Sequence, residues 1–191
     1  MSWKFVVPSS GSKIAGLGVV KGVEDSYELK LGISRAKGFP ADAYMEMTPR
    51  FPKQIGLGDS FSTIDSVWVA SQRLADLVKQ HAPKDLELLP ITIRDHKGRA
   101  VAVPYFLIHP LRTVDAIDQT QSKFRWNPIN TELIASFQRL VIDADKLPTD
   151  IGVCRVKHMG SPILVSPGLI DAIVSAKMTG MRWRAIEDHT G

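Results

Sequence analysis

Hydrophobic and polar positions first fall into a clear order at residues 67–93. Residues 67–70 are almost all apolar and predict a short buried strand. Ser71 follows as a helix N-cap, because its hydroxyl can accept a hydrogen bond from an amide of the first helical turn. The helix should end before Pro83, and residues 86–93 predict the next strand. The side chains that recur at helical spacing between them are Leu74, Leu77, Val78 and His81.

The same order returns near the C-terminus. Residues 162–165 predict a buried strand, and Ser166 is the expected N-cap of a second helix. Pro167 then occupies the first helical position, where its missing amide hydrogen leaves no bond unmade. Gly180 is expected to end this helix as its C′ residue, before a strand at residues 181–186. The apolar stripe of this helix consists of Leu169, Ile170, Ile173 and Val174.

Residues 69–91 and 164–186 align without a gap, and their caps, apolar stripes and following strands coincide. We interpret the agreement as an internal two-fold similarity; a common unit that arose twice is the alternative. Isolated helices of this length are marginal in water, so both must pack their stripes on a sheet. We therefore predict an α+β fold in which two similar strand–helix–strand units pack on a mainly antiparallel sheet. The identical pairs are Ser71/Ser166, Leu74/Leu169, Asp76/Asp171 and Ile91/Ile186.

Glycine and proline interrupt the pattern in the first part of the chain. Alternation in residues 26–31 predicts a short half-buried strand, and another short strand is expected near residues 44–47. The prolines within residues 32–62 make the rest of that stretch mostly loop. We expect residues 1–65 to form an irregular β and loop region and residues 66–191 an α+β domain, both within one compact unit.

The middle of the chain contains one ambiguous element. Residues 94–99 are typical of a polar hairpin turn, and a strand follows at residues 101–108, where Pro104 indicates an edge or a bulge. Residues 131–142 fit either a helical stripe or a strand. Residues 151–157 alternate as a strand.

Composition narrows the class of protein. Hydrophobic residues make up 44% of the 191 positions and charged residues 23%, which excludes a disordered, collagen-like or coiled-coil chain. No apolar run approaches the ~18 residues that a membrane span needs, and the N-terminus lacks a signal-peptide pattern. Cys154 is the single cysteine, so no internal disulfide can form. We expect a cytoplasmic protein in a reducing compartment, without a membrane partner.

The pattern contains no convincing catalytic constellation. The five histidines lack metal-ligand spacing, and residues 16–18 match only half of a phosphate-binding glycine motif. Asp115 and Asp118 could divide general acid and base roles, but capping and turn chemistry explains them better. Cys154 lies within an apolar strand, which makes it a poor nucleophile for His158 to activate. We therefore predict no catalytic residue, no metal site and no cofactor.

Charge gives a weak indication of the partner. The chain has 24 lysines and arginines against 20 acids, a net charge of +4 and a pI near 9.2. This dispersed excess favours an acidic partner over nucleic acid. On the last strand, Arg182 and Arg184 should share an exposed face while Trp183 faces the core. The candidate partner-binding residues are Arg94, His96, Lys97, Arg99, Arg182 and Arg184.

The order of the motifs resembles a family of bacterial immunity proteins from polymorphic-toxin and contact-dependent systems. The family was first described in myxobacteria and was long known as a domain of unknown function. The resemblance covers roughly residues 60–187, and it favours a strand at residues 137–142. Members typically carry Phe-Arg where this chain has Cys154-Arg155. The motifs that carry it lie at residues 69–74, 88–93, 105–118, 140–143, 154–156, 163–166 and 179–183.

The resemblance implies a small cytoplasmic protein that binds a cognate toxin domain and blocks it. Such a protein needs no catalytic residue, but it needs an exposed surface complementary to the toxin, and residues 32–62 and 94–99 are the candidates. The alternative is a nucleic-acid-binding or regulatory module that uses the basic surface around residues 94–99 and 182–184. That module would bind nucleic acid with steep salt dependence. An enzyme would instead hold Asp115 and Asp118 buried in a cleft.

Overall fold

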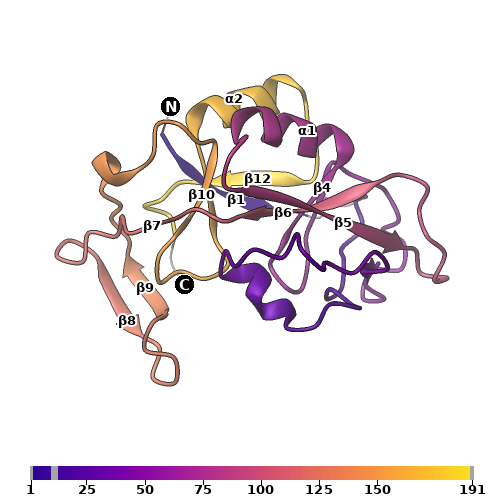
Figure 1. Cartoon of the computed structure of the whole chain (residues 1–191), viewed down its shortest axis with the longest axis horizontal. Helices are drawn as coiled ribbons and strands as arrows, with labels where there is room; N and C mark the ends of the chain where they lie inside the picture. The colour runs from indigo at the N-terminus through magenta and orange to yellow at the C-terminus, as the bar shows by residue number, and fades with distance from the viewer. Residues whose placement is uncertain (1, 10–12, 190–191) are drawn as a thin grey trace.

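The computed structural model describes residues 2–9 and 13–189. These residues form two five-stranded sheets, a two-stranded hairpin and two α-helices, and both helices lie on the same side of the strands (Figure 1). One sheet, called here the β1 sheet, has the strand order β12-β1-β11-β10-β7. The other, called the β6 sheet, has the order β2-β5-β6-β4-β3, and strands β8 and β9 form the hairpin.

The elements follow the chain in this order. The β1 sheet contains β1 (Lys4–Pro8), β7 (Thr113–Val114), β10 (Val153–Val156), β11 (Ile163–Val165) and β12 (Met181–Arg184), with helix α2 (Pro167–Ser175) between its last two strands. The β6 sheet contains β2 (Tyr44–Glu46), β3 (Ser60–Phe61), β4 (Trp68–Ser71), β5 (Leu86–Arg94) and β6 (Tyr105–Pro110), with helix α1 (Gln72–His81) between β4 and β5. The remaining elements are β8 (Lys123–Trp126), β9 (Ile134–Arg139) and the 3-10 helices η1 (Ser26–Lys30) and η2 (Ala144–Lys146).

The two predicted strand–helix–strand units share one topology. In each unit the helix joins two strands that both pair antiparallel with a third strand lying between them; this is β6 for β4–α1–β5 and β1 for β11–α2–β12. The α+β class is thus confirmed, and the ungapped alignment of the two units also matches their strand register. Val69 and Leu89 lie opposite Leu107, and their aligned counterparts Leu164 and Arg184 lie opposite Phe5.

The helix caps confirm the local prediction, but the second helix ends early. The hydroxyl oxygen of Ser71 accepts a hydrogen bond from the backbone nitrogen of Leu74 at 3.3 Å, and Ser166 caps α2 in the same way. Helix α2 ends at Ser175, where Lys177 adopts the left-handed backbone (φ 52°) that we assigned to Gly180. Two predicted stripe residues, His81 and Val174, are exposed.

Three other segments differ from or resolve the predictions. Residues 26–31 form η1 instead of a strand, because Leu29 is buried while Tyr27 and Leu31 on the alternating pattern are exposed. The strand expected at 101–108 begins only at Tyr105, after Pro104. The ambiguous segment 131–142 contains a strand, as the family resemblance favours.

Buried side chains form three clusters around the sheets. The cluster under α1 and α2 joins both sheets, with Trp68 and Ile108 from the β6 sheet and Val165 from the β1 sheet. On the opposite side, residues 13–64 cover the β6 sheet, where Leu17 and Met45 are almost fully buried. A third cluster lies between the β1 sheet and the chain around β8 and β9.

The N-terminal region is integrated into both sheets. Strand β1, which the sequence pattern did not predict, lies between β11 and β12 and completes a sheet whose other strands all follow residue 112. Strands β2 and β3 form the two edges of the β6 sheet. The boundary at residue 65 stays a prediction.

Candidate partner-binding surface

The predicted loop 94–99 lines a groove together with part of the irregular N-terminal region. The groove has a volume of about 440 Å³ and lies at the end of β5. Its floor and one wall are apolar, and the opposite wall carries the charged side chains of the loop. The lining residues are Met47, Pro52, Ile55, Leu57, Asp95, His96, Lys97, Arg99 and Val101.

Asp95 determines the conformation of this loop. Its carboxylate accepts hydrogen bonds from the backbone nitrogens of Lys97 (2.8 Å) and Arg99 (3.0 Å), and from the Arg99 guanidinium at 2.9 and 2.8 Å. The Arg99 side chain, followed by these backbone donors, lowers the pKa of Asp95 to about 2. Gly98 supplies the left-handed backbone (φ 76°) that the turn requires. Arg99 therefore fixes the loop, whereas the side chains of His96 and Lys97 are exposed to solvent.

Arg94 has a different role from the rest of the loop. Its guanidinium lies over the ring of Tyr44, 3.8 Å from the ring centroid, and thereby joins β5 to the edge strand β2. Lys21 lies over the same ring at 5.8 Å and pairs with Glu46 at 2.6 Å. Arg94 is partly buried and does not line the groove, so its contribution to this surface is the position of β2.

Exposed hydrophobic side chains gather in the same part of the chain. Of the twelve large hydrophobic residues that are exposed among the described residues, eight lie within residues 19–64. Ile55 is 63% exposed and Leu57 44% exposed, and both line the groove. Phe51 is 43% exposed, and the guanidinium of Arg50 lies over its ring. Apolar side chains with cations around them are typical of a protein-binding surface.

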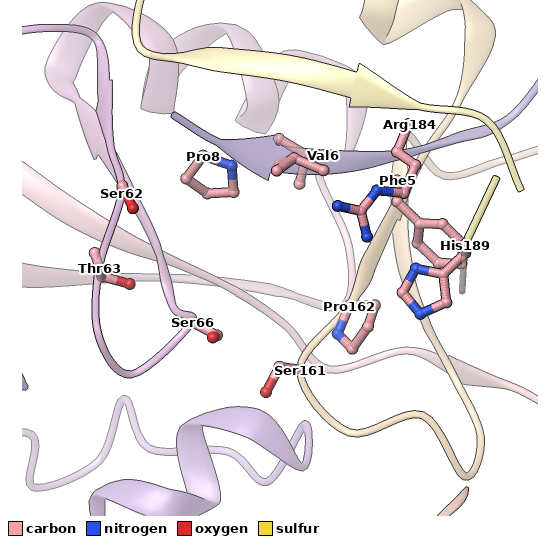
Figure 2. Close-up of a pocket in the computed structure, with 11 residues that line it drawn as sticks. Phe5, Val6, Pro8, Ser62, Thr63, Ser66, Ser161, Pro162, Arg184 and His189 are labelled. Atoms are coloured by element: carbon pink, nitrogen blue, oxygen red, sulfur yellow. The ribbon is translucent and has the colours of Figure 1, made fainter. Parts of the chain in front are cut away.

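The two remaining predicted residues lie elsewhere. Arg182 and Arg184 belong to β12 of the β1 sheet, and neither lines the groove at the end of β5. Trp183 packs against the helix-side cluster, as expected. Arg184 lines a second pocket with Phe5 and His189, and Figure 2 shows its guanidinium there; Arg182 is exposed outside that pocket. The structure thus separates the six predicted residues into two sites.

A buried arginine that the sequence analysis did not single out fixes the segment around η1. Arg155 of β10 is 4% exposed, and burial lowers the pKa of its guanidinium to about 10. The guanidinium donates to the carbonyl oxygens of Leu29 (2.8 Å) and Lys30 (3.1 Å) at the end of η1. It also donates to the carbonyls of Pro110 (3.0 Å) and Gly160 (3.3 Å). Its charge is therefore satisfied by peptide dipoles in place of a carboxylate.

Two further strands bind the residues that follow. Nε2 of the buried His109 on β6 lies 2.7 Å from the carbonyl oxygen of Ile33, which makes Nε2 the donor. Burial lowers the pKa of His109, so the ring is neutral near pH 7. Burial acts to raise the pKa of Glu87 on β5, but hydrogen bonds received from residues 34–36 hold it below its ordinary value. Three strands from two sheets thus hold residues 29–36 by their backbone, and this leaves Leu31 and Ile33 exposed.

Comparison with known proteins identifies the family. The model of the Immunity protein family (Imm11) matches residues 6–188. The chain belongs to this immunity protein family. The match begins in β1, so it includes the N-terminal region that carried little of the resemblance seen in the sequence. No curated protein matches the chain.

Membership of the Imm11 family suggests a non-enzymatic role in toxin immunity, and the two candidate acids have structural partners. Asp115 pairs with Lys157 at 2.9 Å, and this contact lowers the pKa of its carboxyl. Hydrogen bonds from Thr120 and Gln121 lower the pKa of Asp118 to about 2. Both acids are therefore charged carboxylates near pH 7, and neither lies buried in a cleft.

No group of three or more potential metal ligands occurs within residues 2–9 and 13–189. Neither helix in this part of the chain combines the length and apolar character of a membrane span.

The cysteine of this Imm11 protein is expected to be inert in the folded state. Cys154 is fully buried, and burial raises the pKa of its thiol to about 12. Iodoacetamide at pH 8 should therefore leave the native protein unmodified and should alkylate it after denaturation in urea. Mass spectrometry of the intact protein measures both. Rapid native alkylation would contradict the burial and would return the thiol to the list of chemical candidates.

Proposed function

We propose that this chain binds a cognate toxin domain in the cytoplasm and blocks it, and that the groove between residues 47–57 and 95–101 receives part of that toxin. The family match over residues 6–188 is the observation that carries the proposal, because it suggests a role in toxin immunity. The groove supports it further: it combines exposed apolar side chains with a loop of fixed conformation.

The charges around the groove specify the kind of toxin face. His96 and Lys97 project from the loop, Arg50 and Lys53 lie on the facing segment, and all are exposed. Within the groove lining, Asp95 is the one acid, and Arg99 pairs with it. The complementary toxin face carries an apolar side chain that fills the groove, with acidic residues around it. Such charge complementarity accelerates association, while the apolar anchor slows dissociation.

Co-expression with the toxin encoded beside this chain's gene tests the proposal. The chain should restore growth and co-purify with the toxin in a stable complex. A neighbour that is harmless and does not bind would leave the proposal without a target, and a toxin that still kills in the presence of the chain would contradict it.

The substitution Ile55→Asp tests the groove itself. A charge placed at the centre of an apolar contact is expected to weaken toxin binding at least tenfold, about 1.4 kcal/mol or more, and to reduce protection. Because Ile55 is already 63% exposed, the melting temperature should change little.

Val174→Asp is the matched control. Val174 is 58% exposed on α2, on the opposite side of the strands from residues 13–64 (Figure 1), and its substitution should leave binding unchanged. Isothermal titration calorimetry with both variants separates the outcomes. Equal affinity of the Ile55 and Val174 variants would show that the groove is not the toxin site, even if immunity itself stands.

A further inference from the structure

A second pocket, of about 260 Å³, lies between the end of the β1 sheet and two loops (Figure 2). Strand β1 supplies residues 5–8, and β12 supplies Arg184. The β3–β4 loop supplies Ser62, Thr63 and Ser66, and the chain before β11 supplies Ser161. No acidic residue lines this pocket, although a guanidinium, an imidazole and several hydroxyls do.

Arg184 lacks the partner that the other enclosed arginines have. Arg155 is satisfied by four backbone bonds, and Arg35 pairs with Glu28. In contrast, no ion pair formed within residues 2–9 and 13–189 includes Arg184, which is partly buried. Figure 2 shows its guanidinium reaching from β12 into the space beside Pro162, on the same side as His189. A partly buried cation in a pocket without acids provides an electrostatic site for an anion.

His189 provides the second, independent observation. Its ring packs against Phe5, with the ring centroids 4.7 Å apart, and against Phe137 at 5.9 Å. Its Nδ1 atom is buried and has no hydrogen-bond partner among the described residues. A buried polar atom without a partner costs about 1–3 kcal/mol, so native proteins rarely retain one unless a water, an ion or a ligand satisfies it.

The hydroxyls of the pocket complete a set of donors. Thr63 uses its hydroxyl within the loop, where Oγ1 donates to the carbonyl oxygen of Val67 at 3.0 Å. The side-chain hydrogen bonds of the described residues do not engage Ser62, Ser66 or Ser161, and their hydroxyls therefore stay available. A guanidinium can donate two parallel hydrogen bonds to a carboxylate or a phosphate, and hydroxyls can bind the remaining oxygens.

We propose that this pocket binds a small oxyanion, the carboxylate or phosphate group of a small organic ligand, with the Arg184 guanidinium as its main contact. His189 and the serines donate to the remaining oxygens of that group. The pocket is several times larger than a single water, whose share of liquid volume is about 30 Å³, so it has room for a small organic part beside the anionic group. Residues 5–8 of β1 form the apolar wall for that part. The site is separate from the groove at β5 and does not depend on toxin binding.

Titration of the purified chain with inorganic phosphate and with acetate tests the site. At pH 7 and constant ionic strength, each anion should shift the imidazole NMR signals of His189 saturably. Stronger binding of phosphate would identify a phosphate ester as the ligand class, and stronger binding of acetate a carboxylate. The substitution Arg184→Gln should weaken the binding of both anions at least tenfold.

Arg182→Gln is the matched control, because it removes the same charge from the same strand at a position outside the pocket. This variant should bind as the native chain does. Should the Arg184→Gln variant fail to fold, Arg184→Lys carries the test, since lysine keeps the charge but cannot donate in a bidentate fashion, and it should also bind more weakly. The absence of saturable shifts in the native chain, or equal binding by the Arg182 and Arg184 variants, would overturn the proposal.

Discussion

The substitution Gly180→Ala is expected to destabilise the protein by about 4 kcal/mol or more, enough to unfold a large fraction of a typical domain. Gly180 has φ +83°, a conformation that costs a residue with a Cβ about 1–2 kcal/mol. An added Cβ would also lie 1.9 Å from the carbonyl oxygen of Ser60 and 2.6 Å from its carbon. Real Cβ atoms do not approach so closely, so the backbone itself must move.

The backbone around this contact has little freedom to move. The amide of Ser60 donates to the carbonyl oxygen of Thr179 at 3.0 Å, and the carbonyl of Gly180 accepts from the amide of Ser9 at 2.9 Å. Asp59 accepts from the backbone nitrogen of Thr179 at 2.8 Å. Relief of the clash would break bonds that join β1, β3 and β12, and the loss of each is about 1 kcal/mol.

Gly38→Ala separates the steric effect from the conformational one. Gly38 has φ +85°, nearly the same as Gly180, but no atom lies within 4 Å of the position of an added Cβ. This control should lose only the conformational part, about 1–2 kcal/mol. Urea denaturation followed by circular dichroism compares the two variants. If both lose the same stability, the contact with Ser60 is unimportant and our account of Gly180 is wrong.

The reason that sequence alone gave for Gly180 was wrong, and the error shows which interactions a local pattern can reveal. A glycine after an apolar helical stripe indicates a C′ position, but the helix ends earlier, at Ser175. Gly180 is instead needed because the chain passes closely over Ser60, 120 residues earlier in the sequence. Ser71 and Ser166, in contrast, were predicted correctly, because an N-cap and its amide are only three residues apart.

Long-range pairing also explains the other missed elements. The place of β1 between β11 and β12 depends on partners about 160 residues away, and its own four apolar or basic residues give no indication of them. The alternation in residues 26–31 predicted a strand, yet Arg155 and Glu87 bind the backbone of this region in a different conformation. Tertiary contacts therefore overrode a weak local preference.

The candidate binding surface was predictable in part. The basic, exposed loop 94–99 could be identified because its residues are adjacent in the sequence. Its apolar complement could not, since Ile55 and Leu57 lie in an irregular segment without periodicity. The separation of Arg184 from this loop likewise follows from the sheet order, which the sequence did not specify. Similar residue types thus gave the chemistry of two surfaces without their location.

The buried guanidinium of Arg155 is the basis of the second large effect: Arg155→Met is expected to cost about 3–5 kcal/mol of stability. Methionine can fill much of the same space, but it cannot donate to the carbonyls of Leu29 and Lys30. Hydrogen bonds to charged groups contribute about 1.5–3 kcal/mol each, and these carbonyls would remain buried without partners. Removal of the guanidinium also releases Pro110, so the contact between β6, β10 and η1 weakens.

Arg112→Met is the control from the neighbouring chain segment. Arg112 pairs with Asp85 at 3.2 Å, but both side chains are about half exposed, so this pair contributes about 0–1 kcal/mol. Equilibrium denaturation measures the difference between the variants, and hydrogen exchange locates it. The Arg155 variant should lose protection selectively at the amides of Arg35 and Ala36, which bind Glu87 at the far end of the same segment. Equal losses of stability in the two variants, or unchanged protection of these amides, would mean that Arg155 does not hold η1 on the sheets. The selective loss would instead show that one buried cation fixes the segment that presents Tyr27, Leu31 and Ile33 to solvent.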